Sequence, residues 1–319
     1  MKILRDINNL DLRNTYIAIG SFDGIHRGHQ YLISKMIKDA KKNKHPSVVL
    51  TYNPIPRYFI NNFKDDIMLT TLDEKVSLIS QLNPDYLVII NFTNHIWHMK
   101  AYDFLRNILV TKLDVQKIFI GENHHFGYNR VGTPEFIKSY KDVFSFDIEI
   151  IEPLFNHHSK RAISSSLIRK LLYERVFSDV LDLLAHPYLI SGTVIHGKGI
   201  GKNIGIPTAN ISVEKGKLLP SNGVYPSKVK LENKIYDGVL AIGTAPTMKN
   251  EKTKNIELHI FNFNDNIYNY KIELYLIKYL RKEMFFDSKE KLINEINKDI
   301  KQSKDILKEV TEYGFKQRG

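Results

Sequence analysis

Short apolar runs alternate with segments of helical periodicity along the first part of the chain. The apolar runs lie at residues 16–20, 47–52, 86–92, 117–121 and 146–151. Between them, apolar residues recur at helical spacing near residues 31–42, 72–82, 101–113 and 134–140. Alternation of this kind is typical of βαβ units and predicts a mostly parallel sheet with helices on both faces. Such sheets bind ligands at the carboxyl ends of their strands.

The pattern changes beyond His186 and Pro187. Two helical segments, 164–173 and 178–184, precede the change. Runs rich in β-branched residues then follow, separated by Gly and Pro, at 188–195, 224–231, 235–243, 255–263 and 270–279. They predict an antiparallel barrel or sandwich, and the apolar stripe of residues 288–313 predicts a helix that packs on it. We therefore expect an α/β protein with two domains, residues 1–185 and 186–319.

Composition narrows the class of protein. The 319 residues include no cysteine, which excludes disulfides, cysteine nucleophiles and iron–sulfur clusters. No apolar run approaches the roughly 20 residues of a membrane span, and the N-terminus lacks the apolar core of a signal peptide, so we expect a cytoplasmic protein without membrane contact. The net charge of +11 is spread along the chain rather than clustered, so no nucleic-acid partner is expected. No feature of the sequence specifies an oligomeric state.

The first candidate site follows the strand at residues 16–20. The loop reads GSFDGIHRGH from Gly20 to His29, and a helix begins after it. Glycines let the backbone approach a phosphate closely, and a helix start offers free N–H groups. His26 and His29 form the HxGH arrangement of nucleotidyltransferases, in which two imidazoles steady negative charge on an α-phosphate. The nucleotide-binding residues predicted in this loop are Gly20, Phe22, Gly24 and Gly28.

A second phosphate-binding element is predicted where the helix at 164–173 begins. Ser164, Ser165 and Ser166 supply three hydroxyls there, and Arg169 follows one turn later. Hydroxyls, backbone amides and a guanidinium suit a triphosphate tail. A serine run alone is more often a helix cap, and only its pairing with HxGH favours phosphate binding. No general base stands beside HxGH, which points to an acceptor that is already an ionised phosphomonoester.

The second candidate site lies in the glycine-rich segment 192–210. Gly197, Gly199 and Gly201 can wrap a phosphate, although the segment matches neither the Walker P-loop nor the dinucleotide fingerprint. Pro207 leads into Thr208 and Asn210, which point the same way on an extended segment and offer hard oxygen ligands for Mg²⁺. Downstream, Glu257 lies on a predicted strand. If it faced a cavity, its carboxylate could accept a proton from an alcohol, as a kinase requires.

These segments together resemble the bifunctional bacterial riboflavin kinase/FAD synthetase family over almost the whole chain. HxGH is shared with many nucleotidyltransferases, whereas the glycine loop that ends in PTAN is much more specific to flavokinases. The resemblance implies that ATP phosphorylates riboflavin in the C-terminal barrel, with Glu257 as base and Thr208 and Asn210 at Mg²⁺. It implies that FMN attacks a second ATP in the N-terminal domain, giving FAD and pyrophosphate. It also implies that Asn123 lies in the nucleotide or metal shell and that Arg281 contacts the flavin.

Four positions depart from the family pattern in the N-terminal half. Asn53 and Ile55 replace an acid and a histidine of the TFDPHP segment, His124 replaces a phenylalanine, and Leu167 replaces an arginine. The changes at Leu167 and Asn53 remove potential phosphate and metal contacts from the adenylylation site. The sequence therefore leaves three hypotheses: a bifunctional enzyme acting on small-molecule substrates, a riboflavin kinase whose adenylyltransferase half is inactive or weakened, and a basic RNA-binding protein on a retired enzyme scaffold.

Overall fold

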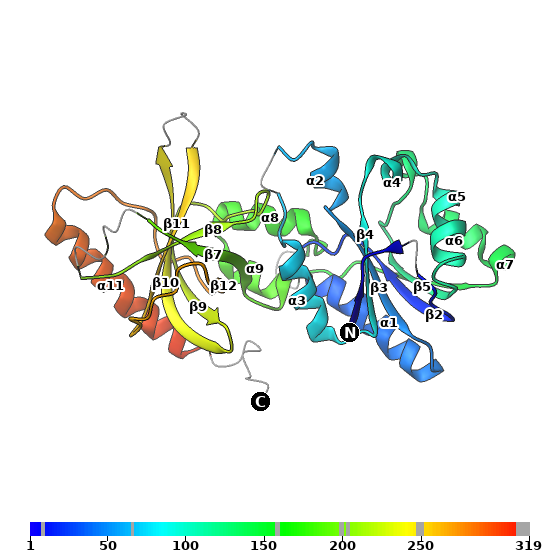
Figure 1. The fold of residues 1–319 in the computed structure, drawn as a ribbon, viewed down its shortest axis with the longest axis horizontal. Coiled ribbons are helices and arrows are strands. Elements are labelled where there is room, and N and C mark those ends of the chain that lie inside the picture. The colour runs from blue at the N-terminus through cyan, green and yellow to red at the C-terminus, as the bar shows by residue number, and fades with distance from the viewer. Residues whose placement is uncertain are drawn as a thin grey trace. The chain divides into compact units, whose positions relative to one another are not determined.

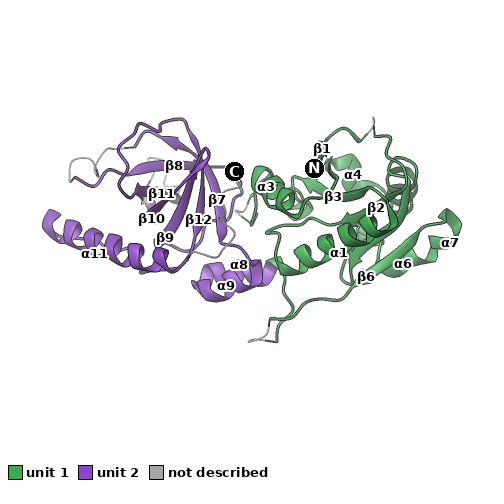
Figure 2. Cartoon of the chain, turned by 90° about the horizontal axis from the view of Figure 1, so that it is seen from below, with its two compact units in different colours: residues 1–165 green, residues 166–319 purple. Residues whose placement is uncertain are grey.

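The computed structural model describes residues 1–7, 10–64, 67–156, 160–197, 201, 205–246 and 252–310. The chain forms two compact units, residues 1–165 and 166–319 (Figure 2). The division falls before the helices that precede the barrel, which belong to the second unit. The domain boundary that the sequence predicts between residues 185 and 186 stays a prediction.

A six-stranded parallel sheet forms the centre of the first unit, in the order β1-β4-β3-β2-β5-β6 (Figure 1). Its strands are β1 (Lys2–Leu4), β2 (Thr15–Ile19), β3 (Ser47–Asn53), β4 (Tyr86–Asn91), β5 (Val115–Gly121) and β6 (Asp147–Ile151). Strand order reverses at β2, because β3 lies on one side of it and β5 on the other. Ligands bind at such switch points, beyond the carboxyl ends of the strands.

Helices connect these strands. They are α1 (Arg27–Asn43), α2 (Pro56–Ile60), α3 (Leu72–Leu82), α4 (Asn94–His98), α5 (Ala101–Asp103), α6 (Pro134–Ser139) and α7 (Lys141–Phe144). A 3₁₀ turn, η3 (Tyr128–Arg130), lies between β5 and α6. Helix α1 packs its apolar stripe against β2, β3 and β5. A capping box fixes the start of α3, since Thr71 accepts from the Glu74 backbone N–H while the Glu74 carboxylate accepts from that of Thr71.

The predicted helix at 101–113 takes a different form. Helix α5 is short, and a π-helical segment, η2 (Phe104–Val110), continues it. The backbone N–H of Thr111 donates to the carbonyl of Arg106, five residues earlier, as the wider helix requires. Its apolar residues, including Phe104 and Leu105, still pack on the sheet. The parallel sheet with connecting helices predicted for this half is thus confirmed.

The second unit begins with α8 (Ser165–Glu174), apart from its first residue, and α9 (Phe177–Leu184), and continues as a closed barrel. The barrel strands are β7 (Tyr188–Ile195), β8 (Ala209–Val213), β9 (Gly223–Leu231), β10 (Lys234–Pro246), β11 (Lys252–Ile260) and β12 (Lys271–Leu276), in the order β10-β11-β8-β7-β12-β9. Every barrel pairing is antiparallel. This confirms the predicted barrel.

The terminal helix α11 (Lys289–Lys308) covers one side of the barrel. Leu307 from this helix joins a buried cluster with Val224, Val239 and Phe261 of the barrel. The predicted C-terminal helix is therefore confirmed as far as Lys308, and residues 311–319 lie outside the described part. Among the helices of the described ranges, none has the length and apolar character needed to cross a membrane.

Candidate active sites

The loop between β2 and α1 holds the HxGH histidines at the switch point of the sheet. His26 caps α1, and its Nδ1 accepts a hydrogen bond from the backbone N–H of His29 at 3.4 Å. A nitrogen that accepts from an amide carries no proton, so a neutral His26 holds its proton on Nε2. The two imidazoles stack with their centroids 3.5 Å apart and their planes 19° from parallel. The structure thus brings the two rings together, while their predicted role at an α-phosphate stays a prediction.

His29 is held as a neutral ring. Its pKa lies well below the usual value because the ring is buried and because His26 and Lys75 oppose a further positive charge. Its Nδ1 is buried, and no partner for it occurs in the described ranges. The ring also packs edge-on against Phe22, with the centroids 5.3 Å apart. The neutral His29 ring can offer one N–H donor to an anionic oxygen, and the Nε2–H of His26 can offer another.

Backbone geometry explains two of the glycines in this loop. Gly24 has a φ of 86°, a conformation that side chains disfavour. A Cβ on Gly28 would lie 3.3 Å from the His26 ring, so a larger residue would press on the stacked pair. Gly20 and Phe22 lie in the same loop, where the Phe22 ring covers Gly20. The structure thus brings the predicted residues of this loop together, while their contact with a nucleotide stays a prediction.

Hydrogen bonds anchor the loop from two other segments. The Asp23 carboxylate accepts from the Thr70 backbone N–H at 3.0 Å, and the Thr70 hydroxyl accepts from the Gly24 N–H at 3.1 Å. The Ser165 hydroxyl donates to the Asp23 carbonyl at 2.8 Å. Ser165 therefore ties the serine run to the histidine loop, a contact that its predicted role at the phosphates did not include.

The remaining residues of the serine element divide between the two units. Ser164 lies in the first unit, while Ser166 and Arg169 lie on α8 in the second. The predicted helix start at the serine run is confirmed, since α8 begins at Ser165. Phosphate binding by Ser164, Ser166 and Arg169 stays a prediction.

Sequence reasoning missed a buried lysine beside this loop. The Lys75 ammonium donates to the Ser21 carbonyl at 2.8 Å and to the Thr51 hydroxyl and Tyr52 carbonyl at 3.3 Å each. Burial lowers its pKa to about 8, against an opposing effect of Asp23. Its burial could have been predicted from the helical spacing, because Lys75 lies on the same buried stripe of α3 as Leu78 and Ile79.

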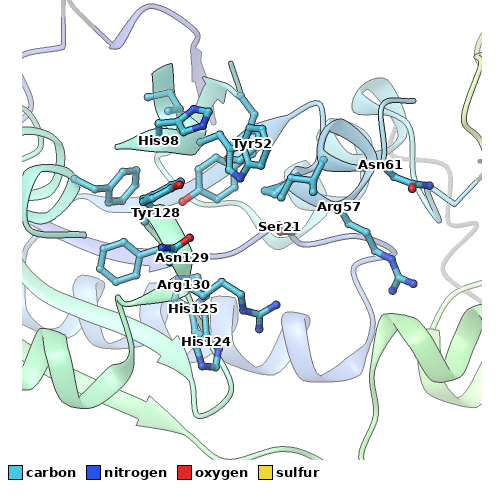
Figure 3. Close-up of a pocket in the computed structure, with 18 of the residues that line it drawn as sticks. Ser21, Tyr52, Arg57, Asn61, His98, His124, His125, Tyr128, Asn129 and Arg130 are labelled. Carbon is cyan, nitrogen blue, oxygen red and sulfur yellow. The ribbon is translucent and has the colours of Figure 1, made fainter. Parts of the chain in front are cut away.

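A cavity of about 1040 Å³ opens beside the histidine loop (Figure 3). Ser21 from the β2 loop, Tyr52 from β3, Phe92 after β4 and Asn123 after β5 all line it, so it lies at the carboxyl ends of four adjacent strands. Six Phe, Tyr and Trp side chains line it, with Trp97, Phe104, Phe126 and Tyr128 added to Tyr52 and Phe92, and polar residues such as Arg57 and Arg130 line it as well. A concave site of this size with aromatic side chains in its wall suits a planar organic ring.

Two of the sequence-predicted positions lie in the cavity wall. Asn123 is exposed there, and its carbonyl lies 2.9 Å from His125 Nδ1. His124, which replaces the family's phenylalanine, stacks near Phe126 with 6.0 Å between centroids. Burial, with a smaller effect of His125, lowers the pKa of His124 to about 4, so the ring is neutral at pH 7. Its Nε2 is buried, with no partner among the residues the structure describes.

Two further positions that depart from the family pattern, Ile55 and Asn53, have local contacts in the structure. Ile55 is 4% exposed and packs with Tyr58 and Met68, so an apolar cluster occupies the place of the family's histidine. Asn53 ends β3, and its carbonyl accepts from the Phe92 backbone N–H at 2.9 Å. These contacts keep the segment folded without the charged residues of the family pattern.

The barrel holds the second constellation on the outward face of β8 and β11. Asn210 and Glu257 are direct partners in the antiparallel register. Ile256 and Leu258 are buried, whereas Glu257 is half-buried, so the carboxylate lies on the face away from the barrel interior. Asn255 donates from Nδ2 to Glu257 Oε1 at 2.8 Å, which fixes one carboxylate oxygen.

The described glycines of the preceding loop pack directly on this pair of strands. A Cβ on Gly197 would lie 1.8 Å from Asn210 Nδ2, and one on Gly201 would lie 2.8 Å from Thr208 Oγ1. The Pro207 carbonyl lies 2.8 Å from His259 Nδ1, a neighbour of Glu257 on the same face. Gly199 lies outside the described residues. The structure thus assembles Gly197, Gly201, Pro207, Thr208, Asn210 and Glu257 as one group.

Arg281 has a structural partner that the sequence did not indicate. Its Nε and Nη2 donate to the two carboxylate oxygens of Asp299 on α11 at 2.8 and 2.6 Å, and Nη1 donates to the Lys282 carbonyl. Burial raises the pKa of Asp299, although Arg281 opposes that shift. Arg281 therefore joins the barrel to its terminal helix, and its predicted contact with flavin stays a prediction.

Comparison with known proteins covers both units. A family model described as FAD synthetase matches residues 8–167, and one described as riboflavin kinase matches residues 184–307. A bifunctional riboflavin kinase/FMN adenylyltransferase from Buchnera aphidicola subsp. Schizaphis graminum is 40% identical over 304 residues, 94% of this chain and 97% of the relative. The protein of the same description from Escherichia coli (strain K12) is 31% identical over 303 residues, 94% and 96% of the two chains.

A solved structure has the same fold over nearly its whole length. It is a crystal structure described as a macrolide-efflux protein from Streptococcus pneumoniae, with a TM-score of 0.85 and 25% identity, covering 96% of this chain and 99% of that one. The fold and the two sites define an α/β nucleotidyltransferase unit joined to a flavokinase barrel. The chain belongs to the family of bifunctional riboflavin kinase/FMN adenylyltransferases.

Proposed function

We propose that this enzyme makes FAD from riboflavin in two ATP-consuming steps, one in each unit. The observation that carries the proposal is that each unit holds its own constellation for phosphate chemistry. The first unit has the stacked histidines beside an aromatic cavity, and the barrel has Asn210 opposite Glu257. The membership of the family and the matches to both of its models support the two activities together.

In the barrel, riboflavin is the acceptor of a phosphoryl group. The Glu257 carboxylate takes the proton of the ribityl hydroxyl while that oxygen attacks the γ-phosphorus of ATP, and the bond to ADP breaks. The hydrogen bond from Asn255 orients the carboxylate for this task. The glycines at 197, 199 and 201, with Pro207, are the proposed contacts of the ATP phosphates, and Arg281 is the proposed residue on the flavin side.

The donor set beside Glu257 fits Mg²⁺. Thr208 supplies a hydroxyl and Asn210 an amide oxygen, both hard ligands, and these side chains pack closely against Gly201 and Gly197 respectively. These two residues would hold the ion with the ATP phosphates, whose charge it would offset. Within the described ranges no cluster of three His, Asp or Glu side chains competes as a metal site.

In the first unit, FMN is the nucleophile and needs no base. Its phosphate has a second pKa of roughly 6 and is ionised at pH 7. A phosphate oxygen attacks the α-phosphorus of ATP, the bond to pyrophosphate breaks, and FAD forms. The N–H donors of His26 and His29 stabilise the charge on the α-phosphoryl oxygens, with Gly20, Phe22, Gly24, Gly28 and Asn123 around the nucleotide. Ser164 and Ser165 of this unit are the proposed contacts of the departing phosphates.

The aromatic cavity is the proposed site of the flavin ring of FMN. Ser21, the residue directly after Gly20, lines this cavity. A flavin ring bound there would therefore lie next to the histidine loop, and its ribityl phosphate could extend toward that loop. Neutral His124 and the aromatic wall can contact the ring without adding charge. The substitutions at Asn53, Ile55 and Leu167 leave this cavity and the histidine stack formed.

The kinase-only hypothesis receives less support than the bifunctional one. The FAD synthetase model matches the N-terminal half, and relatives of both activities cover more than nine-tenths of the chain. The RNA-binding hypothesis gains nothing from these matches. Small-molecule substrates and a cytoplasmic location remain our proposal for the setting in which the enzyme works.

A chromatographic product assay tests the proposal. The protein is incubated with ATP and Mg²⁺, once with riboflavin and once with FMN. We expect FAD from both incubations. FMN from the first incubation with no product from the second would establish the kinase-only alternative, and no product from either would contradict the proposed function.

A further inference from the structure

Lys75 is a buried cation whose ammonium lies beneath the histidine loop. It is 2% exposed and lies on α3, on the stripe that faces the sheet. All three of its hydrogen-bond acceptors belong to the carboxyl ends of β2 and β3: the Ser21 carbonyl, the Thr51 hydroxyl and the Tyr52 carbonyl. The Thr51 hydroxyl in turn donates to the Ser21 carbonyl at 3.1 Å. A single ammonium thus joins the start of the histidine loop to the neighbouring strand.

The Lys75 ammonium forms no hydrogen bond to a carboxylate among the described residues. Its three acceptors are neutral oxygens, and the structure gives it no carboxylate partner among the residues it describes. Asp23 acts on it only through space, while the Asp23 carboxylate accepts from Thr70. A buried ion without a bonded counter-ion is costly, and such ions are concentrated at functional sites.

The described titratable groups near Lys75 include, besides Asp23, two histidines, Glu74 and Tyr52. Burial and the proximity of Lys75 hold His29 neutral, and His26 stacks on His29. Glu74, the neighbour of Lys75 on α3, accepts from the backbone N–H of Thr71. Burial raises the pKa of the Tyr52 phenol, so it stays neutral. The carboxylates of this group, Asp23 and Glu74, accept from backbone N–H groups, and a nucleotide would bring further negative charge.

We propose that Lys75 is a positioning residue for adenylylation: its ammonium holds the histidine loop through the Ser21 carbonyl and supplies the buried positive charge that the ATP phosphates compensate on binding. The proposal rests on the adenylyltransferase function proposed above. It assigns a role that acts through the Ser21 carbonyl, the Thr51 hydroxyl and the Tyr52 carbonyl, which the ammonium contacts.

The proposal requires ATP binding and protonation of Lys75 to be coupled. Its pKa in the free protein is about 8, lowered by burial. A bound polyphosphate favours the charged form and raises this pKa, so ATP binds the protonated protein more tightly. The advantage is complete well below the free-protein pKa and disappears as the pH rises above the pKa of the complex. Each unit by which binding raises the pKa corresponds to a tenfold difference in affinity.

The test measures the KM for ATP in FAD formation from added FMN, from about pH 7 to about pH 9.5, in the wild type and in Lys75→Met. Methionine keeps an unbranched side chain of similar length without the charge. For the wild type we expect the KM to rise about tenfold across this range. For Lys75→Met we expect a KM already raised about tenfold at pH 7 and unchanged at higher pH.

Two controls separate this effect from other causes. Lys38→Met removes an equal charge from the exposed face of α1 and should keep the wild-type profile. The KM for ATP in riboflavin phosphorylation by the same Lys75→Met protein should equal that of the wild type. Because that activity reports only on the second unit, thermal unfolding of Lys75→Met serves as the check that the first unit is folded.

Several outcomes would overturn the proposal. A wild-type KM that stays flat across the pH range would do so even if Lys75→Met failed to fold. A loss in Lys75→Met that is equal at every pH would indicate a packing role only. Absence of FAD formation by the wild type would instead contradict the proposed function, so the two failures are distinguishable.

Discussion

The two candidate sites differ in the elements that hold their residues: loops in the first unit and paired strands in the barrel. In the first unit, chemistry depends on loops at the ends of parallel strands and on groups whose protonation burial controls: neutral His29, neutral His124 and buried Lys75. In the barrel, Asn210 and Glu257 are partners in a strand register, and their alternation with buried residues places them on one face. The first site should therefore respond to changes in burial and charge, and the second to changes in backbone packing.

The largest expected effect is on the histidine pair. His29→Ala removes an N–H donor and the ring that stacks on His26, so FAD formation from FMN should fall by about 10²–10³-fold or more. FMN formation from riboflavin by the same protein should be unchanged. Steady-state rates of both half-reactions provide the measurement. A loss of both activities in a folded variant would mean that the two sites are not separate.

Glu257→Gln should produce the reverse pattern. The amide keeps the size of the side chain but cannot accept the ribityl proton, so riboflavin phosphorylation should fall by about 10²–10⁴-fold. Adenylylation of added FMN should proceed at the wild-type rate, and this serves as the internal control. Undiminished kinase activity in Glu257→Gln would exclude the carboxylate as the base.

A smaller loss is expected from crowding the barrel site. Gly197→Ala would place a Cβ on the Asn210 amide, so the asparagine must turn and riboflavin phosphorylation should fall by about tenfold, the equivalent of about 1.4 kcal/mol. Gly121→Ala is the matched control, because a Cβ there has no neighbour within 4 Å. Equal kinase rates for the two variants would show that the position of Asn210 is unimportant.

The smallest effect concerns the cavity wall. His124→Phe restores the phenylalanine of the family pattern. It removes a buried nitrogen that lacks a partner among the described residues, so the free energy of unfolding should rise by about 1 kcal/mol. Because His124 is already neutral above about pH 5, with a pKa of about 4, the change should leave the pH profile of FAD formation as it is. Thermal unfolding and the pH profile test the two parts. A lower melting temperature, or a profile that changes near neutral pH, would contradict this account.

The strand patterns predicted most of the fold. The apolar runs at 47–52 and 188–195 correspond closely to β3 and β7, because a parallel or closed sheet demands continuous or alternating apolar residues. The apolar pattern did not predict β1, which has only three residues, or β8, whose five residues follow the glycine-rich loop. It also did not anticipate the π-helical continuation of α5, since that depends on backbone hydrogen bonds rather than on residue type.

Some features of the candidate sites could be predicted from the sequence and others could not. HxGH and the glycine loop could be read from the sequence because their chemistry depends on near neighbours. The contacts of Lys75 and the pairing of Arg281 with Asp299 join residues 18 to 54 positions apart, so only the folded chain reveals them. The cavity likewise combines loops from four strands, and no single segment carries its pattern.

The central claim is that two independent sites act in sequence, and complementation between variants tests it most directly. His29→Ala and Glu257→Gln are each incubated with riboflavin, ATP and Mg²⁺, alone and mixed. Neither variant alone should form FAD at an appreciable rate, whereas the mixture should, because FMN made by the first variant is adenylylated by the second. A mixture that forms no FAD, although both proteins are folded, would contradict the account.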